Sequence, residues 1–115
     1  MPGRADKLSV SIAASPAAVY EFASNPMNLP KWAAGLAGAV KIEFAERNHL
    51  GVLDHVVTLP SGQKVMVPLR VNPKGDGSEV VLTLIQTPDM SDAQMEQDAK
   101  LVLKDLAALK KAIER

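Results

Sequence analysis

The sequence predicts an α+β domain in which a curved antiparallel sheet wraps around a long C-terminal helix, with two short helices after the first strand. Three observations lead to this prediction. Apolar and polar residues alternate through the middle of the chain as they do in strands, an apolar stripe at helical spacing runs through the last part, and prolines divide the segment after the first strand. A chain of 115 residues has room for one hydrophobic core, so we expect a single domain over residues 1–115.

The first strand and the two short helices are predicted from local signals. Apolar residues alternate with serines over Lys7–Ala14, which indicates a strand covered on one face. Ser15 then suits an N-cap and is followed by a proline suited to the first helical position, which predicts a helix over Pro16–Ser24. Met27–Trp32 is predicted to form a second short turn or helix, interrupted by Pro30.

We expect at most four strands after these helices. Turn-forming residues at Pro60–Gly62 and in the NPKGDG segment, Asn72–Gly77, separate the later ones. Pro68 indicates an edge position or a bulge, because proline cannot donate a ladder hydrogen bond. The predicted strands are Val40–Ala45, Gly51–Leu59, Lys64–Val71 and Ser78–Thr87.

The last predicted strand, Ser78–Thr87, is apolar on both faces. If Leu82 and Leu84 face the core, Val81 and Ile85 point outward, and an apolar outer face often marks a partner surface. The pattern therefore predicts a protein-interaction surface, either a homodimer through Val81 and Ile85 or a site for another protein.

The C-terminal helix is the most regular element of the sequence. Ser91 and Gln94 have the spacing of a capping box, which predicts a helix from Asp92 to about Ile113. At the standard rise this helix is roughly 33 Å long, so it can cross the whole sheet. Its apolar stripe consists of Met95, Ala99, Val102, Leu106, Leu109 and Ile113.

Two motifs carry a family resemblance. Residues 9–36 contain a strand followed by an S-P-x-x-V-Y-x-F helix and an N-P-x-N-x-P-x-W turn, and a TPDMSDAQ segment leads into the long helix. In these motifs and in the order of its elements, essentially the whole chain resembles the START-like, or SRPBCC, superfamily, which includes pollen-allergen-like proteins and the polyketide cyclase/dehydrase group. The resemblance implies a helix-grip fold. Members usually carry six strands after the two small helices, so this chain is expected to be a shortened member with a smaller cavity.

The resemblance also implies a function. We expect a small intracellular binding protein whose cavity, between the sheet and the C-terminal helix, takes a small apolar or lipid-like molecule by apolar contact. One alternative is a polyketide cyclase- or isomerase-like enzyme that uses His55 as general base. The other is an interaction protein with a solid core and no ligand. The ligand-binding residues expected in the cavity are Trp32, His55, Val67, Leu84 and Val102.

His55 is the one internal acid or base candidate, because an imidazole beside Leu53 and Val57 would have its pKa moved by burial. Asp54 cannot form a dyad with it, since neighbours on a strand point to opposite faces. His49 and His55 lack the spacing of metal ligands, and the sequence has no cysteine. We therefore expect no metal and no cofactor.

Charge and hydropathy limit the remaining classes of partner. Thirteen basic and thirteen acidic residues give a net charge of zero, which disfavours binding to nucleic acid or to an anionic membrane. No segment has the length of a signal peptide core or a transmembrane helix, so no membrane insertion is expected. Together with the absence of cysteine, this predicts a soluble cytoplasmic protein. Arg70 is expected to be an edge arginine in solvent.

Overall fold

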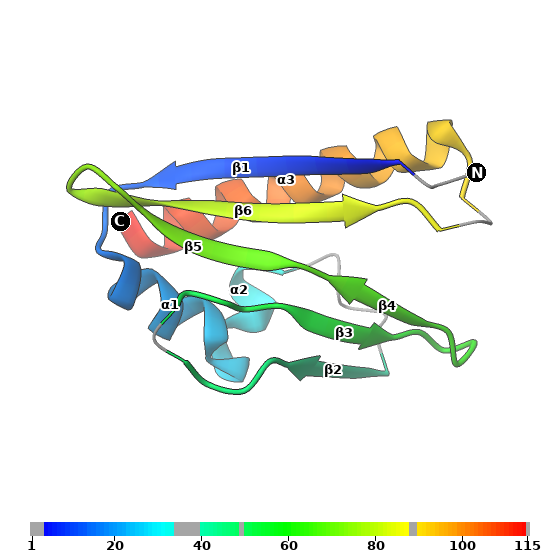
Figure 1. The fold of residues 1–115 in the computed structure, drawn as a ribbon, viewed down its shortest axis with the longest axis horizontal. Coiled ribbons are helices and arrows are strands. Elements are labelled where there is room, and N and C mark those ends of the chain that lie inside the picture. Colours follow the sequence, from blue (N-terminus) through cyan, green and yellow to red (C-terminus); the bar gives the residue numbers. More distant parts are fainter. Residues whose placement is uncertain (1–3, 34–39, 49, 88–89, 115) are drawn as a thin grey trace.

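A computed structural model describes residues 4–33, 40–48, 50–87 and 90–114 (Figure 1). The long C-terminal helix and the two short helices after the first strand are confirmed. In chain order the elements are β1 (Ala5–Ile12), α1 (Pro16–Ser24), a 3₁₀ turn (Pro26–Asn28), α2 (Leu29–Trp32), β2 (Lys41–Phe44), β3 (His55–Thr58), β4 (Lys64–Val67), β5 (Leu69–Lys74), β6 (Gly77–Ile85) and α3 (Asp92–Glu114).

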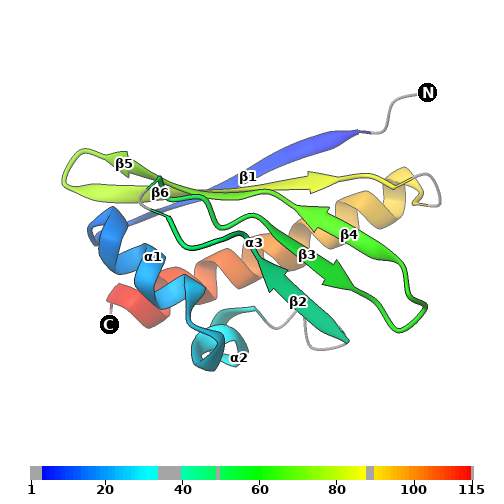
Figure 2. The same ribbon diagram turned by 60° about the horizontal axis from the view of Figure 1, so that its bottom comes forward.

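Within the described residues, the strands form two three-stranded antiparallel sheets, ordered β1-β6-β5 and β2-β3-β4. The two sheets meet at Pro68, which separates β4 from β5. The backbone N–H of Leu53 donates to the Leu69 carbonyl at 2.8 Å, so the chain before β3 also pairs with β5. Figures 1 and 2 show the two sheets following one another as a bent surface, with α3 running along the β1-β6 side. The expected curved antiparallel arrangement is confirmed, in two sheets and not in one.

The strand boundaries differ from the sequence prediction at prolines and at the sheet edge. The predicted strand Lys64–Val71 is two strands, because Pro68 lacks an N–H; its carbonyl still accepts from the Thr83 N–H at 2.9 Å. The expected limit of four strands after the short helices is therefore wrong, since five are present in the described residues. Pro73 lies within β5, not in the loop as expected, and the turn to β6 is shortened to Gly75 and its neighbour.

Side-chain caps set the starts of α1 and of the 3₁₀ turn before α2. Ser15 Oγ accepts a hydrogen bond from the Ala18 N–H at 3.2 Å, which confirms the predicted start of α1. The Asn25 side chain accepts from the Met27 N–H at 3.0 Å and starts the 3₁₀ turn. Pro30 does not interrupt α2 as expected, because it lies in the first turn, where no N–H is needed.

The long helix α3 begins where the capping pattern predicts. Ser91 Oγ accepts from the Gln94 N–H at 3.1 Å, and the Ser91 carbonyl accepts from the Met95 N–H at 2.9 Å. The Gln94 side-chain amide donates to Asp98 Oδ1 at 2.8 Å, so this side chain points along the helix and not back to the cap. The apolar stripe of α3 faces the protein interior as predicted, since its members Met95, Leu106 and Leu109 are almost completely buried.

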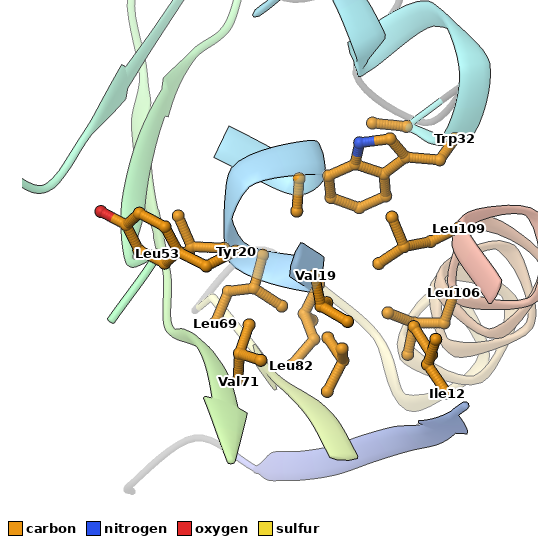
Figure 3. Packing of buried hydrophobic residues seen from close by; sticks show 13 residues of the cluster. Ile12, Val19, Tyr20, Trp32, Leu53, Leu69, Val71, Leu82, Leu106 and Leu109 are labelled. Carbon is orange, nitrogen blue, oxygen red and sulfur yellow. The ribbon is translucent and has the colours of Figure 1, made fainter. Parts of the chain in front are cut away.

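The hydrophobic core is closed by α1, α2 and the C-terminal half of α3 over β5 and β6 (Figure 3). Partly buried side chains from β1, β2, β4 and α3 pack against it. No helix in the described part of the chain is long and apolar enough to cross a membrane. The labelled members of the core in Figure 3 are Ile12, Val19, Tyr20, Trp32, Leu53, Leu69, Val71, Leu82, Leu106 and Leu109.

Candidate functional site

A row of side chains crosses the inner face of β2, β3 and β4. Strand register places Phe44 opposite His55, and His55 opposite Val67. Directly opposite residues project to the same face of a sheet, so these three side chains are neighbours. Two of the expected ligand-binding residues, His55 and Val67, are thus brought side by side. The adjoining row on the same face consists of Ile42, Val57 and Val65.

The other three expected ligand-binding residues come from three different elements. Leu84 lies on β6 and Val102 on α3, and both pack, half-buried like Val67, against the hydrophobic core. Trp32 belongs to the core itself, at 4% exposure, on α2. Four of the five residues therefore belong to one packed region, and His55 lies beside Val67 at its margin with 4% exposure.

Burial is uneven along the inner side of the bent sheet. Near α1 and α2 the inward side chains of β5 and β6, such as Leu69 and Val80, are completely buried, as are Leu106 and Leu109 facing them. On the inner face of β2 and β4 the corresponding side chains retain partial exposure. The half-buried residues there are Ile42, Phe44, Val65 and Val67. The inner side of β2-β3-β4 is thus the less completely covered half of the sheet.

The indole of Trp32 carries a buried donor that no described residue satisfies. Its Nε1 is inaccessible and has no hydrogen-bond partner among the described residues. Figure 3 shows the six-membered ring turned toward Val19 and Leu109 and the nitrogen on the edge that faces away from them. A buried donor left without an acceptor costs about 1–3 kcal/mol. An acceptor on a bound molecule would remove that penalty.

The imidazole of His55 has a defined tautomer. Its Nδ1 lies 3.0 Å from the Leu53 carbonyl oxygen, which can only accept, so Nδ1 carries the proton and Nε2 has the lone pair. Burial lowers the pKa of His55, and the Leu53 hydrogen bond and the nearby Asp54 charge offset this only in part. The ring of Phe44 packs against the imidazole with centroids 5.1 Å apart. The side chain is therefore a neutral base in an apolar setting.

Asp54 points to the opposite side of the sheet, which confirms that it does not form a dyad with His55. Its carboxylate accepts from Arg70 Nε at 2.9 Å and Nη2 at 2.8 Å, and from the Leu69 N–H at 2.9 Å. The hydrogen bonds from Arg70 lower the pKa of Asp54. Arg70, expected in solvent, is half exposed and held by this ion pair.

A pocket of about 650 Å³ lies elsewhere, between α1, the segment before β3, and β5. Its walls include Ala17, Tyr20, Arg47, Gly51 and Val71, and none of the five expected ligand-binding residues lines it. Sequence reasoning missed this pocket because its walls meet only when the chain folds. The one local signal was the glycine at position 51, which has a positive φ of 73°.

A metal centre and the outer face of β6 are two further candidate sites. Among the described residues, no group of three or more His, Cys, Asp or Glu side chains is arranged to hold a metal ion; His49 lies outside them.

On the outer face of β6, Val81 is half-buried and lies opposite Ser9 on one side and Arg70 on the other. Ile85 is 38% exposed. Val81 is therefore set between polar neighbours, whereas Ile85 lies opposite Ala5.

Comparison with solved structures places this architecture in a known class. No protein-family model matches the sequence, and no curated protein matches it. The architecture is a helix-grip fold, which the chain shares with solved structures of low sequence identity.

Three similar solved structures illustrate the likeness, at identities that establish the fold alone. The KanY protein superposes with a TM-score of 0.69 at 18% identity, over 100% of both chains. An AHSA1-like protein from Rhizobium etli gives 0.70 at 18% identity, over 97% of this chain and 82% of that one. CalU16 from Micromonospora echinospora gives 0.75 at 17% identity, over 96% and 74%.

Proposed function

We propose that the protein binds a small apolar molecule on the inner side of β2-β3-β4, beneath α3. The observation that carries this proposal is the uneven burial of the inner side of the sheets. Phe44 and Val67 are partly exposed there, whereas Leu69 and Val80 are completely buried. Covering such surface is favourable by about 25 cal/mol per Å² before the costs of association. The START-like fold supports the proposal, because its long helix and bent sheet face each other across this region.

The proposed ligand carries one hydrogen-bond acceptor on its apolar body. The support for this is Trp32 Nε1, a buried donor without an acceptor among the described residues. His55 is neutral and contributes mainly apolar ring surface, since its Nδ1 already donates to Leu53. A ketone, ester or ether on a hydrocarbon frame has the required character.

A pair of matched probes tests this proposal. 2-Acetonaphthone has an apolar double ring and one carbonyl acceptor, and 2-ethylnaphthalene has the same carbon skeleton without the acceptor. Trp32 is the single tryptophan of the sequence, so its indole N–H gives one unambiguous NMR signal. We expect 2-acetonaphthone to move this signal downfield and to bind more tightly than 2-ethylnaphthalene. The proposal is wrong if neither probe perturbs the resonances of Val67 and Val102.

Adjacent positions of β4 supply a matched control. Val67→Phe fills the inner face, whereas Met66→Phe adds the same ring to the outer face, where Met66 is 51% exposed. We expect Val67→Phe to weaken probe binding and Met66→Phe to leave it unchanged. Equal effects of the two substitutions would show that the probe does not occupy the inner side.

A second candidate function, that of a cyclase or isomerase, rests on the tautomer of His55. Because Nδ1 is the donor, Nε2 is free to take a proton from a bound substrate, and the lowered pKa keeps it unprotonated at neutral pH. In D₂O, a general base at this position would exchange the methyl protons of 2-acetonaphthone for deuterium. We expect His55→Gln to abolish exchange while the probe still binds. Exchange no faster than with free imidazole argues against catalysis.

The third candidate is the interaction protein, and with it the homodimer through Val81 and Ile85. The sequence pattern supports this candidate. Ser9 and Arg70, the polar neighbours of Val81, weigh against a large apolar interface. Sedimentation velocity over a wide concentration range, with Val81→Lys as control, decides between monomer and dimer. We further propose a cytoplasmic location on the basis of the cysteine-free sequence, to be tested by cell fractionation.

A further inference from the structure

The pocket between α1 and β5 is partly open to solvent and lies apart from the inner face of the sheet. At about 650 Å³ it falls within the range of roughly 300–1,000 Å³ typical of small-molecule sites. Pro16 and Ala17 from α1 and Val71 and Pro73 from β5 give it apolar walls. Its polar groups lie on the side formed by α1 and the segment before β3.

The wall before β3 is preformed by its own hydrogen bonds. The Asn48 N–H donates to Tyr20 Oη at 3.1 Å, which fixes this segment on α1. Asn48 Oδ1 accepts from the backbone N–H groups of Leu50 and Val52 at 2.9 and 3.1 Å. The Val71 N–H donates to the Gly51 carbonyl at 2.8 Å and joins the segment to β5. The described residues of this wall are therefore tied to α1 and β5 before a ligand binds, which lowers the cost of binding.

Arg47 and Glu21 form an ion pair at this pocket, and the two side chains are held unequally. Each side chain is 63% exposed, so the pair is in contact with water and exchangeable. The guanidinium of Arg47 also lies over the buried ring of Tyr20, 5.3 Å from its centroid. Glu21 has no comparable second contact among the described residues. If a competing carboxylate displaces Glu21, Arg47 stays in place over Tyr20.

We propose that this pocket binds a small carboxylic acid whose carboxylate pairs with Arg47 and whose apolar body rests on Ala17 and Val71. The planar guanidinium suits a carboxylate because it offers parallel N–H donors. This site is independent of the ligand on the inner side of β2-β3-β4, since the two share no lining residue among those described.

trans-Cinnamate and its neutral analogue trans-cinnamamide are the probes that test this site. We expect cinnamate to shift the backbone amide signals of Ala17 and Gly51 and to bind about tenfold more tightly than cinnamamide, because one charge-assisted pair is lost in the amide. Arg47→Gln is expected to remove this tenfold preference. Glu21→Gln is expected to raise the affinity for cinnamate, because it removes a competing carboxylate. A weaker affinity in Glu21→Gln, or no preference over cinnamamide in the wild type, overturns the proposal.

Two neighbouring alanines on the exposed side of α1 locate the site. Ala17 lines the pocket and Ala18 does not, so Ala17→Phe blocks it while Ala18→Phe adds the same ring beside it. We expect loss of cinnamate binding in the first variant alone. Circular dichroism confirms that both variants are folded. If Ala17→Phe binds cinnamate as the wild type does, or if cinnamate moves only the Trp32 indole signal, the pocket is not the site.

Discussion

The carboxylate of Asp54 and the guanidinium of Arg70 form a two-point ion pair, with Nε–Oδ1 and Nη2–Oδ2 distances of 2.9 and 2.8 Å. Asp54 also accepts from the N–H of Leu69, whose residue is completely buried. This contact ties the residue directly before β3 to β5, at the point where Pro68 divides the predicted strand. Asp54 therefore links the two sheets where they meet.

Removal of either partner is expected to have a graded effect on stability. Asp54→Ala should lower the free energy of unfolding by about 1–2 kcal/mol, because the buried Leu69 N–H loses its acceptor. Arg70→Ala should cost less than Asp54→Ala, because it removes only a half-exposed ion pair. Urea unfolding of both variants measures the difference. A larger loss in Arg70→Ala than in Asp54→Ala would contradict this account.

His55 predicts a pH dependence of stability. Its pKa is lowered in the folded protein by burial, so the unfolded chain binds the proton more readily. The free energy of unfolding is therefore expected to fall as the pH drops below 6.5, the ordinary pKa of histidine. This fall should be smaller in His55→Gln than in the wild type. Asp54 and Glu114 also have lowered pKa values, but their contribution is lost only below their ordinary values of 3.8 and 4.5.

Urea unfolding between about pH 8 and about pH 5 isolates the effect of His55, because the contributions of Asp54 and Glu114 are lost only at lower pH and the variant retains His49. Identical pH slopes for the wild type and His55→Gln would mean that this imidazole is not kept neutral by burial.

Gly51 is expected to be intolerant of any side chain. It has a φ of 73°, and a Cβ added there would lie 2.2 Å from the Val71 carbonyl oxygen. Gly75 has a similar φ of 57° but open space around it. Gly75→Ala should therefore cost about 1–2 kcal/mol of unfolding free energy from backbone strain, and Gly51→Ala clearly more. Thermal unfolding of the two variants makes the comparison, and equal losses would show that the contact with Val71 relaxes easily.

The start of α3 gives a fourth prediction. Ser91→Ala should cost about 1 kcal/mol, because the Gln94 N–H loses its acceptor. Gln94→Ala should have a small effect, since its side chain bonds to the exposed side of the helix at Asp98 and not to the cap. If Gln94→Ala destabilises the protein as much as Ser91→Ala, the complete capping box forms in solution.

The sequence predicts the elements of this fold well because their signals are local. Ser15 and Ser91 cap α1 and α3 where the pattern places them, and the apolar stripe of α3 is buried as expected. Pro68 indicated an edge position or a bulge. Whether the strand divides there depends on how the residues around Pro68 pair with β6 and with the segment before β3. Local sequence patterns do not determine which distant strands pair, so the division into two sheets was not predicted.

The candidate site was predictable only in part, for the same reason. Alternation places His55 and Val67 on inner faces, but only the register of β3 and β4 sets them opposite one another. The unsatisfied Trp32 Nε1 and the approach of Arg47 to Tyr20 arise from tertiary packing. No sequence pattern at these positions indicated either feature.

Intermolecular NOEs between isotope-labelled protein and bound 2-acetonaphthone test the central claim, that a small apolar molecule lies on the inner side of β2-β3-β4. The structure predicts contacts from the naphthalene protons to the methyl groups of Val67, Leu84 and Val102. Contacts confined to Ala17 and Val71, or no intermolecular contacts at all, would contradict it.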